Sequence, residues 1–338
     1  MTTEEILYKL TSAVGPSGAE ENVIAAISEI LGDEYEFTSD SFGNLFCTVG
    51  EGYHIMLDAH TDEIGMVVKS ITEDGFIKID KCGGPDNRML LASEVSIWGK
   101  EEVKGVISTL PPHLQKDDDK KAPDFDEVAI DVGMTKEEAE KLISLGDRVT
   151  FRRNFSKLLN NQLSASVLDD RSGVAALILA LKQIQNPPCK VTAMFSAQEE
   201  VGIRGAKVGA YGKNVDEVIA VDVSFGYTPM CKKTDCGELG KGPMIGVSAI
   251  LDRDITDRLF EVAKDCDIPY QTEVMGGGRT GTNADVISLT ESGIKTALVS
   301  IPEKYMHSPI EVVDIKDVEN TAKLLSQYVI KRAGEVNA

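Results

Sequence analysis

Residues 191–205 constrain the fold and chemistry of this chain more than any other stretch. The segment opens with the mostly apolar run Val191–Phe195, whose β-branched and aromatic residues are typical of a buried strand, and it leads into the adjacent carboxylates Glu199 and Glu200. Both acids therefore stand at the carboxyl end of a strand. Ligands bind at that end of open α/β sheets, where one acid of a hydrolase can coordinate a metal while its neighbour moves a proton.

Taken alone, the Glu199/Glu200 pair is weak evidence, because such pairs also occur at solvated helix starts and because turns after strands are polar in general. Other predicted strand ends of the chain carry the same residue types. They are His60 and Asp62 after residues 53–58, Asp169 and Asp170 after 164–168, Asp222 after 217–221, and His307 beyond 296–301. Their co-occurrence, rather than any single acid, predicts one functional site.

The order of the predicted elements indicates an α/β chain with an insertion. Residues 3–31 read as two helices broken at 15–18, with Thr3 as the expected cap of the first, and 317–331 reads as a closing amphipathic helix. Residues 67–159 instead show short alternating strands interrupted by glycines. We therefore predict a main α/β unit formed by residues 1–66 and 160–338, and an inserted small β-rich domain formed by 67–159. A length of 338 residues fits this division.

The composition excludes several classes of partner. A formal net charge of −20 argues against nucleic acid and anionic membranes, which require basic patches. No apolar run approaches the roughly 18 residues of a membrane span, and the acidic start lacks the features of a signal peptide, so we expect a cytoplasmic protein. Six scattered cysteines favour reduced thiols over a disulfide framework. Small molecules or peptides remain as substrates.

The mixture of imidazoles and carboxylates at these strand ends, without cysteine, suits divalent metals of the zinc, cobalt or manganese kind. One carboxylate can bridge two ions about 3.5–4 Å apart, and the set of residues is large enough for two ions. Asp62 lies one pleat beyond His60 on the same strand face, where it can hold the imidazole in one tautomer.

Five motifs, spread over nearly the whole chain, resemble the glutamyl aminopeptidase and tetrahedral (TET) aminopeptidase family of two-metal exopeptidases, some of whose members carry an endoglucanase label. In chain order they are His60-x-Asp62, Leu168-Asp-Asp-Arg-x-Gly173, Glu199-Glu-x-Gly202, Val221-Asp-Val223 and Tyr305-Met-His-Ser-Pro309. The resemblance implies a mixed-sheet co-catalytic metallopeptidase domain with the β-rich insertion. It also implies homo-oligomers, dimers building into a dodecamer, with the insertion supplying much of the contact.

The resemblance also implies roles for individual residues. His60 and Asp222 resemble terminal ligands of opposite ions, Asp169 the bridge, and Glu200 and His307 the residues that complete the two sites. Glu199 resembles the general base, which takes a proton from a water activated by both ions and later passes it to the leaving amine. Asp62 is expected to orient the first histidine, and the Asp169–Asp170 peptide is expected to be cis.

One departure from the family pattern is Asn283 in the glycine-rich turn, near a position where many relatives carry aspartate, and it leaves substrate selectivity open. Three other activities also stay open. A glycosidase such as an endoglucanase could use Asp169/Asp170 or Glu199/Glu200 without metal, although the histidines would then have no role. A metal-dependent deacylase of small amides would differ only in its pocket, and a metal-stabilised binding module would not need Glu199.

Overall fold

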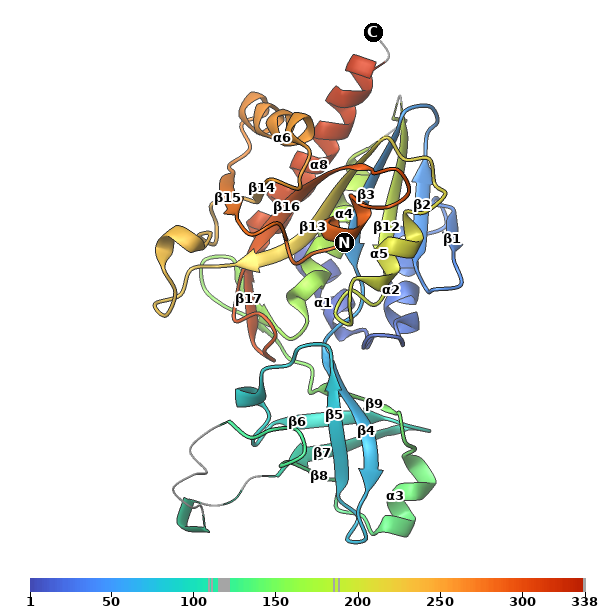
Figure 1. Ribbon diagram of the computed structural model, residues 1–338, viewed down its shortest axis with the longest axis vertical. Helices are drawn as coiled ribbons and strands as arrows, with labels where there is room; N and C mark the ends of the chain where they lie inside the picture. The colour runs from blue at the N-terminus through green and yellow to red at the C-terminus, as the bar shows by residue number, and fades with distance from the viewer. Residues whose placement is uncertain (109, 111, 115–121, 185, 188, 337–338) are drawn as a thin grey trace.

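The computed structural model describes residues 1–108, 110, 112–114, 122–184, 186–187 and 189–336. It consists of an α/β unit built on a mixed sheet and a separate small antiparallel barrel (Figure 1). The chain leaves the main sheet after strand β3 (His54–His60) and rejoins it at β10 (Phe155–Lys157). This arrangement confirms the predicted fold class, a mixed-sheet α/β unit interrupted by a β-rich insertion.

Among the described residues, the main sheet has eleven strands, and its centre is parallel. Strands β12, β3, β13 and β16 lie side by side and run in the same direction. The remaining strands flank them mostly in antiparallel pairs. Besides β3 and β10, whose bounds are given above, the strands of this sheet are, in chain order, β1 (Phe37–Ser39), β2 (Leu45–Val49), β11 (Gln162–Ala165), β12 (Lys190–Ser196), β13 (Glu217–Phe225), β14 (Met244–Ser248), β15 (Gln271–Met275), β16 (Lys295–Lys304) and β17 (Glu311–Asp314).

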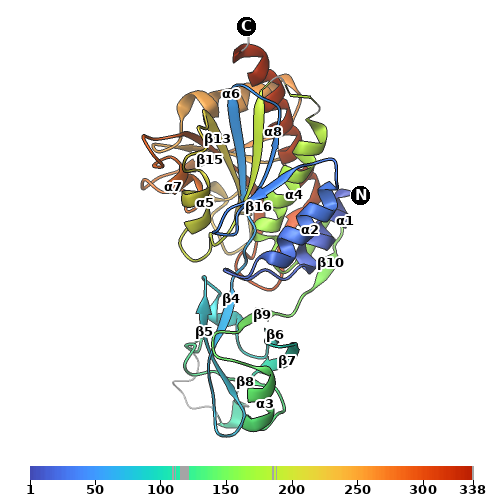
Figure 2. The ribbon, with the colours of Figure 1, turned by 90° about the vertical axis from the view of Figure 1, so that its right-hand side faces the viewer.

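Helices cover both faces of the main sheet, which explains why its central strands are buried along most of their length rather than at alternate residues (Figure 2). One face is covered by α1 (Thr3–Ser12), α2 (Glu21–Leu31), α4 (Leu168–Gln183), α6 (Arg253–Asp265) and α8 (Ile315–Val336), the other by α5 (Arg204–Gly209) and α7 (Ala284–Ile287). The cap of α1 was predicted at Thr3 but is Thr2, because the Thr2 side chain accepts from the Glu5 N–H in a reciprocal capping box.

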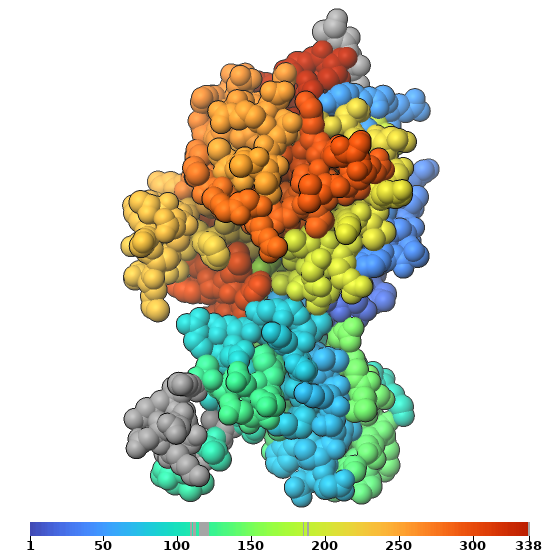
Figure 3. Space-filling model, viewed as in Figure 1, coloured from blue at the N-terminus to red at the C-terminus, as the bar shows by residue number. Residues whose placement is uncertain are grey.

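The barrel forms a lobe below the main unit (Figure 3). It closes through β4 (Gly65–Ile71), β5 (Ile77–Cys82), β8 (Ile130–Asp131), β7 (Glu102–Ile107), β6 (Glu94–Trp98) and β9 (Arg148–Phe151), in that order, with helix α3 (Lys136–Leu142) beside it. Its apolar core is separate from that of the main sheet. Barrel strands thus run from Gly65 to Phe151, whereas β10 already pairs with the main sheet.

The cysteines and the helices of the chain bear on two further predictions. All six cysteines are free thiols, as their scattered positions predicted. Within the described part of the chain, none of the helices combines the length and the apolar character needed to cross a lipid bilayer.

Candidate metal centre

Strand register brings the predicted site residues together at one edge of the main sheet. In the parallel pairing of β12 with β3, Ser196 stands opposite His60, so the turn that carries Glu199 follows directly beside this histidine. In the pairing of β13 with β3, Ala220 stands opposite Asp58. Two residues further along both strands, Asp222 and His60 reach the same level on the same face.

The two oxygens of Asp169 face two different histidines. Asp169 Oδ1 lies 3.1 Å from His60 Nε2, and Asp169 Oδ2 lies 3.4 Å from His307 Nε2. Asp222 Oδ1 lies 3.9 Å from the same His60 nitrogen, and Glu200 Oε2 lies 3.5 Å from the same His307 nitrogen. One carboxylate therefore stands between two clusters that each contain one imidazole and one further acid.

Several groups of ligand atoms lie within 4.8 Å of one another; one joins His60 with Glu199 and Glu200, and two others each combine Asp169 with one histidine. Of these two, the first contains His60, Asp169 and Asp222, and the second contains Asp169, Glu200 and His307. The resemblance implies that His60 and Asp222 bind opposite ions, whereas in the structure their ligand atoms lie in one group. Both residues extend from neighbouring parallel strands, so they share one group. Imidazole nitrogens with carboxylate oxygens fit ions of the zinc, cobalt or manganese class.

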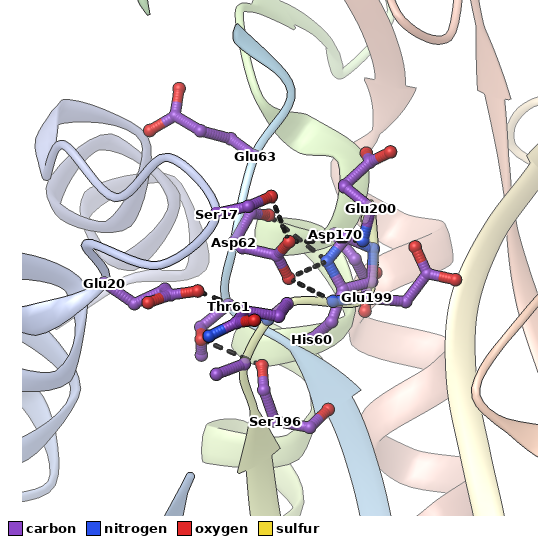
Figure 4. A network of polar contacts seen from close by, with 12 residues as sticks. Ser17, Glu20, His60, Thr61, Asp62, Glu63, Asp170, Ser196, Glu199 and Glu200 are labelled. Carbon is purple, nitrogen blue, oxygen red and sulfur yellow. Dashed lines mark hydrogen bonds and ion pairs between the residues drawn. The ribbon is translucent and has the colours of Figure 1, made fainter. Parts of the chain in front are cut away.

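Asp62 holds the backbone that carries the two glutamates (Figure 4). Its Oδ1 accepts from the Glu199 N–H at 2.8 Å, and its Oδ2 accepts from the Glu200 N–H at 3.1 Å and from Ser17 Oγ at 2.6 Å. His60 Nδ1 lies 3.2 Å from the Asp62 carbonyl oxygen and 3.5 Å from Oδ1. Asp62 thus faces His60, as predicted, and in addition fixes the turn after β12.

His307 is held by groups that sequence reasoning missed. Its Nδ1 donates to the Gly84 carbonyl oxygen at 2.9 Å, which fixes the ring with Nε2 facing the acidic cluster. Glu311 accepts from the His307 N–H at 3.0 Å and, through its other oxygen, from the Asp169 N–H at 3.1 Å. Glu311 lies within β17 rather than after a strand, so the pattern of strand ends gave no signal for it.

The start of α4 explains the spacing of the Asp-Asp-Arg-x-Gly motif. The Asp169–Asp170 peptide is cis, as the resemblance implied. Asp170 Oδ1 accepts from the Gly173 N–H at 2.9 Å, and a Cβ at Gly173 would lie 2.4 Å from the Asp170 oxygens, so only glycine fits there. Arg171 is fully buried and donates to the Leu10 carbonyl oxygen, which ties α4 to α1.

The surroundings shift the pKa values of two acids of the site in opposite directions. Burial raises the pKa of Glu199 to about 8; the charges of Glu200 and Asp169 add to this effect, and His60 opposes it. Burial also disfavours the charged form of Asp169, but hydrogen bonds from His307 and His60 outweigh it and hold its pKa below the usual value. Asp169 therefore stays ionised, whereas Glu199 readily holds a proton.

The sequence pattern of the family described as M42 glutamyl aminopeptidase matches residues 43–324. The chain belongs to this M42 family. A lysyl aminopeptidase of Pyrococcus furiosus is 34% identical over 334 residues, which cover 96% of each chain. Family and relatives together show that the chain is a hydrolase of peptide bonds, a metal-dependent aminopeptidase.

The M42 chain shares its fold with solved structures of other proteins. The TET1 peptidase of Pyrococcus horikoshii superposes with a TM-score of 0.88 at 35% identity, covering 98% of this chain and 100% of that one. A structure from Thermotoga maritima described as an endoglucanase superposes with a TM-score of 0.79 at 27% identity, covering 98% and 99%. The expected resemblance to the glutamyl and TET aminopeptidases is thereby confirmed.

The departure at Asn283 has a physical explanation in this M42 chain. Asn283 Nδ2 donates to Asp58 Oδ2 at 2.7 Å and to Ser196 Oγ at 2.8 Å. Asp58 is buried two residues before His60, and burial raises its pKa to about 6 even though the hydrogen bonds from Ser196 and Asn283 oppose this. An aspartate at position 283 would place a second carboxylate against Asp58, whereas the amide supplies a donor.

Proposed function

We propose that this aminopeptidase removes N-terminal residues from peptides with two divalent ions, zinc or cobalt, with manganese as the next candidate. His60, Asp169 and Asp222 would hold one ion, and Asp169, Glu200 and His307 the other. The observation that carries the proposal is the orientation of Asp169, whose two oxygens face different imidazoles at 3.1 and 3.4 Å. That is the geometry expected of a carboxylate bridging two ions.

When bound, the ions would supply Lewis acidity: they activate a water and offer a coordination position to the free α-amine of the substrate. Glu199 acts as the general base in this proposal. Its backbone is fixed through Asp62, and burial favours its protonated form, as suits a group that accepts a proton and returns it to the leaving amine. Asp62 is a positioning residue for Glu199, Glu200 and His60.

A substrate panel tests this function. Chromogenic aminoacyl substrates are assayed with apo protein and after addition of zinc, cobalt or manganese, beside N-acetylated versions of the same compounds. We expect metal-dependent cleavage of the free-amine substrates and no cleavage of the acetylated ones. Cleavage by the apo protein, or equal cleavage of acetylated substrates, would contradict the proposed role of the metals and of the free amine.

The same panel covers the alternatives. The neighbour described as an endoglucanase keeps glycoside hydrolysis as the alternative to be tested, so a soluble cellulose derivative is included. In a metal-free glycosidase, the buried imidazole of His60, which contacts Asp169, would have no part in the reaction. Small N-acyl amides test the deacylase alternative. Activity on either compound without aminopeptidase activity would replace the proposal.

We also propose that the chain forms homo-oligomers, dimers that build into a dodecamer, with the barrel contributing contacts. The support comes from relatives: the Pyrococcus horikoshii peptidase is described as assembling into a tetrahedron or a large octahedral shell, and a structure of a similar TET1 protein is described as a dodecamer. Light scattering on metal-loaded and metal-stripped protein tests it. A monomer under both conditions would contradict it.

A further inference from the structure

A group made only of carboxylates shares Asp169 with the two-metal site. It consists of Asp169, Glu303 and Glu311, whose ligand oxygens lie within 4.8 Å of one another. All three side chains are buried, with exposed fractions of 6%, 1% and 2%. Glu303 belongs to none of the groups that contain an imidazole, so the proposed two-metal site does not account for its position.

Glu303 is the member of this group whose side chain lacks a partner among the described residues. It stands on β16, and within the described part of the chain neither of its buried oxygens receives a hydrogen bond. The two oxygens of Glu311, by contrast, each accept a backbone N–H. None of the ion pairs found among the described residues involves Glu303 or Glu311. A buried carboxylate without a partner is costly in its charged form, so the site calls for a bound cation or a proton.

The donor set indicates which partner fits. All three side chains offer oxygen and none offers nitrogen or sulfur, which favours the hard ions Mg²⁺, Ca²⁺ and Mn²⁺ over zinc. Oxygens on opposite sides of a Ca²⁺ ion bound at about 2.3–2.6 Å stand about 4.6–5.2 Å apart. The observed limit of 4.8 Å lets the three oxygens surround one such ion.

We propose that Asp169, Glu303 and Glu311 bind a third cation, a hard divalent ion, next to the two-metal site. This ion is additional to the catalytic pair and takes no part in proton transfer. Through the shared Asp169, it would lie against the proposed bridge and steady the carboxylate that both catalytic ions use. The alternative occupant is a proton shared between Glu303 and Glu311, and the experiment separates the two.

The test counts bound ions without using activity. Apo protein is loaded with two equivalents of Co²⁺, whose visible spectrum reports on the sites that contain histidine, and is then titrated with Mn²⁺ followed by electron paramagnetic resonance. We expect the wild type to bind one further Mn²⁺ per chain with the cobalt spectrum unchanged. Glu303→Gln keeps the shape of the side chain and should weaken this binding at least tenfold, again with an unchanged cobalt spectrum.

A matched control and a variant-free measurement complete the test. Glu273 also lies on the main sheet, but its oxygens accept from Ser224 and Ser300, so Glu273→Gln should bind Mn²⁺ like the wild type. Mn²⁺ that binds only by displacing cobalt, or equal Mn²⁺ affinity in Glu303→Gln, would overturn the proposal in favour of the shared proton. Should Glu303→Gln not fold, crystals of cobalt-loaded wild type soaked in Mn²⁺ decide: an anomalous peak beside Glu303 supports the third site, and its absence refutes it.

Discussion

The carboxyl edge of the main sheet and the barrel are both built from buried strands, yet only the first collects charge. Among the described residues of the barrel strands, the buried polar side chains are those of Ser96 and Thr150. The sheet edge buries His60, Asp169 and Asp222 together with several more acids. Parallel strands present all their carboxyl ends at one edge, whereas antiparallel strands alternate their ends around a closed barrel, so only the sheet can gather a site.

The two regions meet where the barrel supports the site through backbone groups and arginines. Gly84, just after β5, accepts from His307, and Arg148 of β9 donates to the Ser17 carbonyl oxygen at 3.1 Å. Arg153, between β9 and β10, pairs with Glu63, which follows β3. The sheet edge thus carries the reactive side chains, and the barrel helps to position them. Four measurements test this division.

The largest effect is expected at Glu199. Glu199→Gln removes the proposed proton acceptor and should lower kcat by about 10²–10⁴-fold while metal content stays at the wild-type level. Steady-state kinetics and metal analysis by mass spectrometry measure both quantities, and the exposed Glu51→Gln serves as the control. Loss of metal with full retention of activity on reloading would mean that the roles of Glu199 and Glu200 are reversed.

The next effect concerns the bridge. Asp169→Asn should weaken both metal-binding steps by at least about 10–100-fold, whereas His60→Ala should weaken chiefly one, because only Asp169 faces both groups. Calorimetric titration of apo protein with zinc resolves the two steps. If the two variants lost the same single step, Asp169 would not bridge.

A smaller effect is expected where the barrel touches the site. A Cβ at Gly84 would lie 3.2 Å from His307 Nδ1, so Gly84→Ala should displace the imidazole slightly and weaken one metal step by about tenfold. In Gly334→Ala the new methyl group meets no atom within 4 Å, which makes it the control. Unchanged metal binding in Gly84→Ala would remove the positioning role from this barrel contact.

The smallest effect on catalysis is expected from the barrel core. Ile97 is fully buried there, so Ile97→Ala should destabilise the barrel by about 2–5 kcal/mol. The change should leave kcat within about twofold, since separate cores respond additively. Trp98 is the only tryptophan, so its fluorescence in guanidinium reports on the barrel while bound cobalt reports on the site.

Val106 is half exposed on the same barrel, and Val106→Ala should change little. If the Trp98 and cobalt signals were lost together at the same denaturant concentration, the two regions would unfold as one cooperative unit, and the division between them would not hold.

The sequence pattern predicted several strands correctly, because neighbouring residues largely decide whether a short segment is buried as a strand. The run before Glu199 became β12, and the residues before His60 became β3, since apolar segments of that length are buried as strands. Groups that act across long separations were not predictable. Gly84 and His307 are 223 residues apart, and the Gly84 contact uses a backbone carbonyl that every residue possesses.

The residue types at the strand ends follow from the chain's order alone, so imidazoles and carboxylates were predictable as ligands for divalent ions. Their grouping arises from the way the strands and helices pack. His60 shares a group with Asp222 because β3 and β13 are parallel neighbours, and Asp169 stands between the histidines because α4 enters at that edge. Ligand grouping depends on ångström-scale distances between segments far apart in the chain, and these are set by strand register and helix packing rather than by local sequence.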